Sequence, residues 1–284
     1  MNAFSRGIRL AKISWGVVKQ DRSMLWLPVL SFVCSLLLTV LFAAGIWGVG
    51  LPESERLEPV HYVILFLLYV ALAFVSIFFN AAVIGMAMKR LRGEDASIRD
   101  GLDLARAHVG KIFVWSVLTA TVGMVLRAIA ERSGIVGRIV LSLIGVAWNV
   151  ITFFVVPVLL FEPVGVTDGI KRSASIFRQR WGETFIGTGA IGLVIFLASL
   201  VVIVVAVPLG MALPALGVAV GVLGLGALAA IGVACTGVFN AALYRYATTG
   251  EASGAFTVED LQTSFRPRER RGLFGGGTPA RLDR

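Results

Sequence analysis

One uninterrupted stretch without a charged residue constrains this chain more than any other feature. It runs from position 184 to 244, over 61 residues. A helix that crosses the hydrocarbon core of a bilayer needs about 20 apolar residues, because its backbone amides must be hydrogen-bonded within the segment. The stretch is therefore long enough for two crossings and a turn, and Pro208, Gly210 and Pro214 mark the predicted turn.

Shorter stretches of the same kind occur at residues 23–52, 59–88 and 139–161, and each is long enough for one crossing. A further crossing has to include Arg127, whose charge reaches the headgroups if it lies near a helix end. We therefore predict an all-α integral membrane protein with a polytopic domain over residues 1–250 and a flexible basic tail over 251–284. The six predicted spans are about 24–49, 61–88, 112–130, 139–161, 184–208 and 215–243.

The composition supports lipid as the solvent. Hydrophobic residues make up 57% of the chain and charged residues 15%, and the mean hydropathy is +0.86, which is too apolar for a water-soluble domain. The net charge is +9, but the basic residues lie between apolar runs and not on one folded face. We expect anionic membrane lipids as partners, and no nucleic acid.

The distribution of lysine and arginine predicts the orientation. Of the 26 such residues, 22 lie before the first span, after the second and fourth spans, or in the tail. The opposite side keeps four, Arg56, Arg127, Arg132 and Arg138. Because basic loops are retained in the cytoplasm, both termini are predicted to be cytoplasmic and the protein to lie in a cytoplasmic membrane.

The polar segments before the first, third and fifth spans share one spacing of apolar residues, at helical intervals of three and four. The positions are Phe4, Ile8, Ala11, Trp15 and Val18; Ile98, Leu102, Ala105, Val109 and Ile112; and Ile170, Ala174, Phe177 and Trp181. Each segment is predicted to form an amphipathic helix at the cytoplasmic interface, followed by a hairpin of two spans. The unit occurs three times, through duplication or through chance similarity of apolar sequence. The candidate headgroup contacts are Arg6, Arg9, Lys12, Lys171, Arg172 and Arg178.

Catalytic patterns are not found. His61 and His108 lie in different regions, Cys34 and Cys235 have no metal-binding spacing, and the dinucleotide-like pattern at 187–192 falls inside a span instead of after a strand. We predict no catalytic residue, no metal and no cofactor, and expect that the protein is not an enzyme.

Several positions within the predicted spans are candidates for other roles. Asn80, Asn149 and Asn240 either hydrogen-bond between helices or form a shared intramembrane polar site. Gly217 and Gly221 form a GxxxG pair, which allows close helix packing within the bundle or between two copies. Pro157 should free a backbone carbonyl near Phe153, as a kink or a hinge.

Several motifs resemble a known group of proteins. They are Arg6-Gly7-Ile8-Arg9-Leu10-Ala11-Lys12 with Trp15, Leu27-Pro28-Val29-Leu30, Phe153-Phe154-Val155-Val156-Pro157-Val158-Leu159, Lys171-Arg172-Ser173 and Trp181-Gly182-Glu183. Together they resemble a family of uncharacterised prokaryotic membrane proteins. The last two are also similar to the membrane domain attached to some glycerophosphodiester phosphodiesterases. The resemblance implies six helices in a bacterial or archaeal cytoplasmic membrane and carries over no catalytic residue.

Two functions compete on these grounds. The first is a non-enzymatic, lipid-associated scaffold or accessory subunit, which forms a homo-oligomer or binds an unknown membrane partner. The alternative is a small-molecule transporter or channel whose path the three asparagines line. Transporters usually carry charges or broken helices within the membrane, and the sequence offers few of them, which favours the first function.

Overall fold

The computed structural model describes residues 3–49, 59–179, 184–251 and 256, and within them it is helical, with no strand. Among these residues, six segments are long and apolar enough to cross a membrane. They are α2, α3, α5, the pair α6 and α7, α9 and α10. The α-helices are α1 (Ala3–Gln20), α2 (Trp26–Val49), α3 (Pro59–Leu91), α4 (Ile98–Ala107), α5 (Val109–Glu131), α6 (Ile135–Ile151), α7 (Val155–Phe161), α8 (Val166–Gln179), α9 (Thr184–Ala212) and α10 (Pro214–Thr249), and a short 3-10 helix, Arg22–Leu25, joins α1 to α2.

The outer surfaces of the long helices are apolar. Leu41 on α2 is 66% exposed, Val136 on α6 is 76% exposed and Leu223 on α10 is 73% exposed. A water-soluble protein rarely exposes continuous apolar surface of this kind, whereas hydrocarbon chains cover it without cost. The exposure therefore supports a multi-pass membrane protein.

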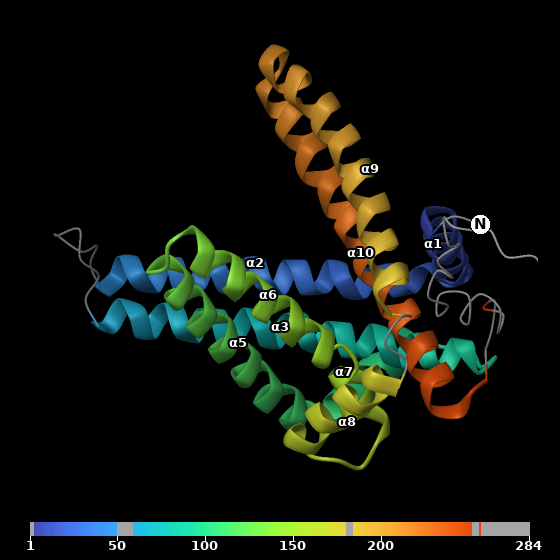
Figure 1. Cartoon of the computed structure of the whole chain (residues 1–284). Coiled ribbons are helices and arrows are strands. Elements are labelled where there is room, and N and C mark those ends of the chain that lie inside the picture. The colour runs from blue at the N-terminus through green and yellow to red at the C-terminus, as the bar shows by residue number, and fades with distance from the viewer. Residues whose placement is uncertain (1–2, 50–58, 180–183, 252–255, 257–284) are drawn as a thin grey trace, which may run out of the picture.

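The core lies where the second halves of α3 and α10 meet. Small residues allow this approach: Ala81, Ala82, Ala241 and Ala242 are buried. A methyl group added at Gly237 on α10 would lie 2.5 Å from a Val83 methyl on α3. Away from this contact the spans separate, and Figure 1 shows α9 and α10 side by side, diverging from α2 and α3.

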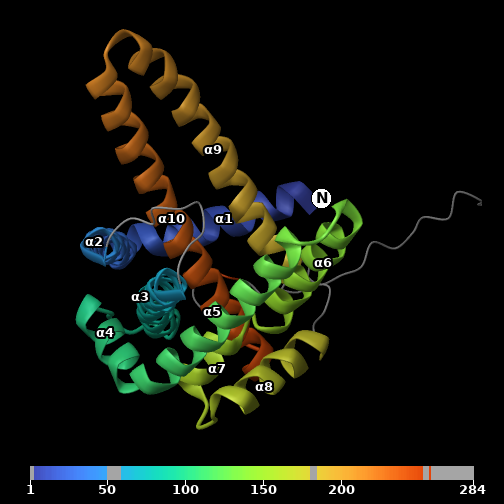
Figure 2. The same ribbon diagram turned by 90° about the vertical axis from the view of Figure 1, so that its left-hand side faces the viewer.

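The helices α1, α4 and α8 each precede two spans, but each packs mainly on other spans. Helix α4 leads into α5 and packs on α3, and α8 leads into α9 and packs on α7 and α6. Helix α1 leads into α2 and packs on α9 and α10. Figure 2 shows α1 crossing these two helices. The three contacts thus follow one cyclic order around the molecule.

The ends of several helices follow from local chemistry. A capping box begins α4, since Asp100 N–H donates to Ser97 Oγ and the Asp100 carboxylate accepts from Ser97 N–H. Pro214 occupies the first turn of α10, where a missing N–H costs no hydrogen bond. Gly250 ends α10 with φ 75°, a left-handed conformation that favours glycine.

Two features differ from the sequence expectations. Pro208 does not begin the turn between the last two spans: α9 continues through it to Ala212, because one proline removes only one helical hydrogen bond. On α1 the buried positions are Leu10, Ser14, Val17 and Val18, of which only Val18 belongs to the predicted stripe. Ile8, Ala11 and Trp15 of that stripe are half-buried against α9 and α10. The side chain of Phe4 lies outside the described residues.

The predicted tail, 251–284, lies outside the described residues except for Glu251 and Phe256. Phe256 is buried and belongs to the same hydrophobic core as α3 and α10. An aromatic side chain gains about 2 kcal/mol or more from such burial, which explains why it packs there.

Candidate functional site

The fourth span is interrupted, and its polar contacts gather at the interruption. Helix α6 ends at Ile151 and α7 begins at Val155. Pro157 lies in the first turn of α7, where its ring is tolerated, but it has no N–H to donate to the carbonyl of Phe153. Within a membrane, backbone groups released by such a break need partners from neighbouring helices.

Ser173 of α8 supplies partners on both sides of the break. Its Oγ donates to the Ile151 carbonyl at 2.6 Å and accepts from the Phe154 N–H at 3.0 Å. The side chain is completely buried. One hydroxyl therefore joins the end of α6 to the start of α7.

Asn240 of α10 supplies a third contact. Its Nδ2 donates to the Phe153 carbonyl at 3.4 Å, which is the carbonyl that Pro157 leaves without its helical donor. The Oδ1 atom of the same amide is buried and finds no hydrogen-bond partner among the described residues. The break is thus held by one polar side chain from α8 and one from α10.

A second polar group, which we call the Glu162 cluster, follows the end of α7 and comprises Glu162, Arg172, Tyr244 and Lys111. The Glu162 carboxylate accepts from Arg172 Nε at 3.1 and 3.2 Å and from the Tyr244 hydroxyl at 3.0 Å. The Tyr244 ring stacks on Phe161 with a centroid distance of 5.9 Å. These contacts tie α7 to α8 and α10.

Basic side chains also hold the ends of two spans. Lys111 Nζ lies 3.4 Å from the Leu159 carbonyl and 3.5 Å from the Glu162 carbonyl, at the end of α7. Arg245 Nη1 donates to the Leu91 carbonyl at 3.1 Å, at the end of α3. The last carbonyls of a helix carry a partial negative charge, so a cation is favourable there.

The polar side chains at the break and in the Glu162 cluster are engaged in contacts that join helices. The Glu162 carboxylate is engaged by a guanidinium and a hydroxyl, and Ser173 is engaged by two backbone groups. Within the described part of the chain, no three His, Cys, Asp or Glu side chains gather as metal ligands would. The observed contacts fix the mutual positions of α7, α8 and α10.

The three asparagines named from the sequence have different surroundings. Only Asn240 contacts the break. Asn149 is exposed on α6 and donates to the Gly145 carbonyl of its own helix at 2.9 Å. Asn80 is half-buried on α3.

The other predicted positions are also accounted for. Gly217 is buried, and a methyl group there would collide with the backbone of Gly210, while at Gly221 it would lie 3.6 Å from Ala206 Cβ.

The side chain of Arg6 lies outside the described residues. The other predicted headgroup contacts are exposed, and two of them have acidic neighbours, since Lys171 pairs with Asp168 at 3.2 Å and Arg172 with Glu162. The exposed set is Arg9, Lys12, Lys171, Arg172 and Arg178.

Sequence reasoning missed Ser173, Glu162, Tyr244 and Lys111. One signal was present for Ser173: it lies between Gly169 and Phe177 at intervals of four, within the buried face of α8. A polar residue in such a stripe indicates a buried partner. Glu162 directly precedes Pro163 and marked only the end of a span, because its partners come from α8 and α10.

The fold and these contacts define a helical protein with six segments suited to crossing a membrane, whose fourth segment is broken and held by its neighbours. The chain matches the family described as Family of unknown function (DUF6159) over residues 59–255, and it belongs to that family. The matched region contains the break and the Glu162 cluster. No curated protein and no solved structure matches the chain. The similarity to the membrane domain of glycerophosphodiester phosphodiesterases and the prokaryotic origin stay predictions.

Proposed function

We propose that this protein is a non-enzymatic, lipid-associated scaffold or accessory subunit of a bacterial or archaeal cytoplasmic membrane. In this proposal both termini are cytoplasmic. The six spans form three hairpins, and α1, α4 and α8 are amphipathic helices that contact the inner leaflet. The observation that carries the proposal is the distribution of charge on these three helices.

Each of the three helices has a buried face and exposed basic side chains. On α8, Ser173 and Phe177 are buried and Arg178 is exposed. On α4, Ala105 is buried and the Arg99 side chain is 89% exposed. A helix with one face on the bundle and basic residues on the other suits a membrane surface of negative charge.

The acidic neighbours distinguish the three helices. On α4, Arg99 and Arg106 both lie within 4 Å of Asp103, so their charge is partly compensated. Helix α1 contains Lys12 and Lys19 among its basic residues and no acidic residue at all. We therefore propose that α1 makes the largest contribution to the preference for anionic lipid.

The test measures which lipids accompany the protein. The protein is reconstituted in equal amounts of phosphatidylglycerol and phosphatidylcholine, extracted in mild detergent, and the ratio of the two co-purified lipids is determined. The double variant K12Q/K19Q should lose much of the enrichment in phosphatidylglycerol, since each basic residue near the surface contributes about 1 kcal/mol. The matched control R99Q/R106Q removes two charges from α4 and should change the ratio less. An unchanged ratio in K12Q/K19Q contradicts the proposal.

The break in the fourth span favours a second candidate, a small-molecule transporter or channel. Discontinuous helices form the substrate sites of many transporters, and Asn240 Oδ1 is a buried acceptor beside the break. The test is potassium, chloride and glycerol flux in proteoliposomes, with wild type compared with N80A/N149A/N240A. Equal fluxes in the two proteins exclude a path lined by these amides.

A further inference from the structure

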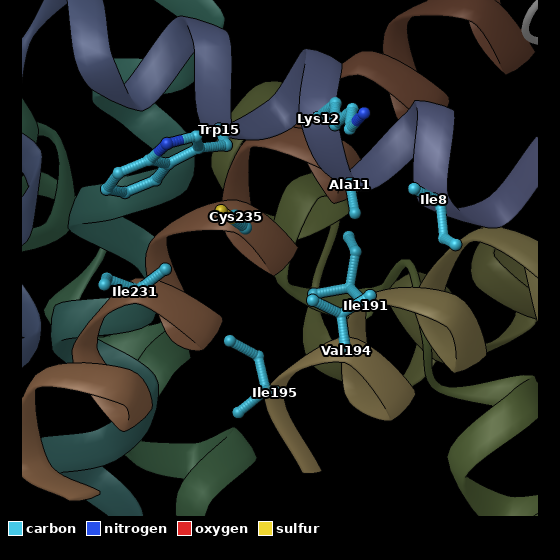
Figure 3. Close-up of a pocket in the computed structure, with 9 residues that line it drawn as sticks. All are labelled: Ile8, Ala11, Lys12, Trp15, Ile191, Val194, Ile195, Ile231 and Cys235. Carbon is cyan, nitrogen blue, oxygen red and sulfur yellow. The ribbon is translucent and has the colours of Figure 1, made fainter. Parts of the chain in front are cut away.

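A cleft opens between α1 and the last two spans. Its walls are Ile8, Ala11 and Trp15 of α1, Ile191, Val194 and Ile195 of α9, and Ile231 and Cys235 of α10, with Lys12 at its edge. Figure 3 shows the isoleucines and Val194 directed toward one another below α1. The cleft encloses about 210 Å³, several times the roughly 30 Å³ that a water molecule occupies in the liquid.

The cleft is unsuited to water and suited to hydrocarbon. Its walls are almost entirely aliphatic, and a water molecule in a pocket needs two to four polar partners. The wall formed by α9 is open to the membrane, since Val194 is 38% exposed and the neighbouring Phe196 is 64% exposed. A chain that leaves the bilayer interior could enter without crossing a polar barrier.

The edge of the cleft carries a positive charge, in contrast to its apolar walls. Lys12 is exposed, and Figure 3 shows its nitrogen directed away from the apolar side chains. Trp15 lies three residues further along α1, at one end of the cleft, and tryptophan prefers the level of the headgroups. Helix α1 contains no acidic residue that would compensate Lys12 within the helix. The charge at the edge therefore complements an anion.

We propose that this cleft binds part of one acyl chain of an anionic glycerophospholipid, whose headgroup of net negative charge pairs with Lys12 through its phosphate. The inference rests on the proposed lipid association and deepens it: one lipid is held as a ligand between α1, α9 and α10. This lipid fills the space between the first helix and the last hairpin and joins the two ends of the chain.

The experiment counts lipids on the full-length protein. Protein reconstituted with phosphatidylglycerol or with phosphatidylcholine of the same acyl chains is delipidated stepwise in mild detergent, and bound lipids are counted by native mass spectrometry. The variants are K12Q, which removes the charge, and V194W, which fills the cleft from an exposed position that tolerates a large side chain. The control is K19Q, which removes the same charge from the same helix outside the cleft.

Wild type and K19Q should retain one phosphatidylglycerol after the other lipids have left. Retention should fall about fivefold in K12Q, as expected for one basic residue near a lipid phosphate. In V194W the lipid should be lost. Equal retention of phosphatidylcholine, equal loss in K19Q and K12Q, or full retention in V194W overturns the proposal. Unfolding midpoints of V194W and wild type within a few degrees show that the variant is folded.

The failure of this inference differs from the failure of the proposed function. If phosphatidylglycerol is enriched in the co-purified pool but no single lipid is retained, binding in the cleft is wrong and the wider lipid association stands. If one lipid is retained but the pool shows no enrichment, the wider lipid association is wrong and the cleft stands as a discrete ligand site.

Discussion

Ser173 shows how a single hydroxyl can stabilise a break in a membrane-crossing helix. The Ile151 carbonyl and the Phe154 N–H both depend on it, and the side chain is fully buried. A buried backbone group without a partner costs far more than an average hydrogen bond gains. The contribution of Ser173 should therefore exceed that of an ordinary helix serine.

The substitution Ser173→Ala should lower the free energy of unfolding by about 1–3 kcal/mol, because the buried Phe154 N–H and the partly buried Ile151 carbonyl both lose the hydroxyl that bonds to them. The measurement is reversible unfolding by SDS in mixed micelles. Ser199→Ala is the matched control, since Ser199 Oγ only bonds to the Ile195 carbonyl of its own helix. Equal effects of the two substitutions would show that the bridge contributes nothing special.

Asp100 provides a prediction on pH. Its hydrogen bond from Ser97, together with Lys89 at 3.0 Å, lowers the pKa of this carboxyl from 3.8 to about 2. Because the pKa is lower in the folded state, the ionised form stabilises the start of α4. That contribution is fully present above pH 3.8 and is lost as the pH falls through 2.

The variant D100N should therefore exchange the backbone amides of residues 97–101 faster than wild type at pH 7. The difference should shrink as the pH approaches 2, where the wild-type carboxyl becomes about half protonated. Hydrogen–deuterium exchange at matched pH measures this, because intrinsic rates largely cancel between the two proteins. A difference that is the same at pH 7 and pH 2 contradicts the role of the carboxylate.

At the scale of elements, the fourth span consists of two helices because side chains of neighbouring helices form hydrogen bonds with the backbone groups at the break. Pro157 alone indicates only a missing donor, and the sequence left a kink and a hinge open. The structure has a three-residue break, in which α8 contributes Ser173 and α10 contributes Asn240. The break is therefore a property of three elements together.

A double-mutant cycle tests the link between Pro157 and Asn240. N240L removes the donor to the Phe153 carbonyl and should cost about 0.5–2 kcal/mol. In the P157A background the cost should be smaller, since an alanine in place of the proline supplies an N–H to the same carbonyl. The coupling free energy from SDS unfolding of the four proteins measures the effect. The same cost of N240L in both backgrounds would argue against a shared carbonyl.

At the scale of the molecule, the cyclic order of the three leading helices brings distant parts of the chain together. Helix α1 packs on α9 and α10, which lie more than 160 residues further along the chain. Each leading helix packs mainly on spans other than the two that follow it. The first helix therefore contributes to stability through its packing on α9 and α10, and the proposed lipid cleft lies at that junction.

The proposed orientation is testable with single cysteines. In a background with Cys34 and Cys235 replaced by serine, R99C and R178C should react with a membrane-impermeant maleimide only after cells are permeabilised. R132C lies between α5 and α6, and it should react in intact cells. All three positions are exposed, so differences in labelling report the side of the membrane. Labelling of R178C from outside would reverse the orientation.

The sequence by itself determined that this chain is helical and has six apolar segments of membrane-spanning length. Length and the absence of charge are local properties, and in lipid they leave the backbone no alternative to a helix. The match over residues 59–255 adds membership in a family of unknown function.

Only the tertiary structure decided which polar residues meet. Asn149 and Asn240 look equivalent in the sequence, yet one bonds within its own helix and the other reaches the Phe153 carbonyl of another span. In the sequence Lys111 and Arg245 only indicate the orientation in the membrane, whereas in the structure they contact backbone carbonyls at the ends of α7 and α3. Such pairings depend on which helices pack against each other, and helices of similar hydropathy do not differ in this respect by their sequence alone. The packing is decided by small residues, such as the alanines of α3 and α10, and by single hydrogen bonds, because all apolar faces are equally soluble in lipid.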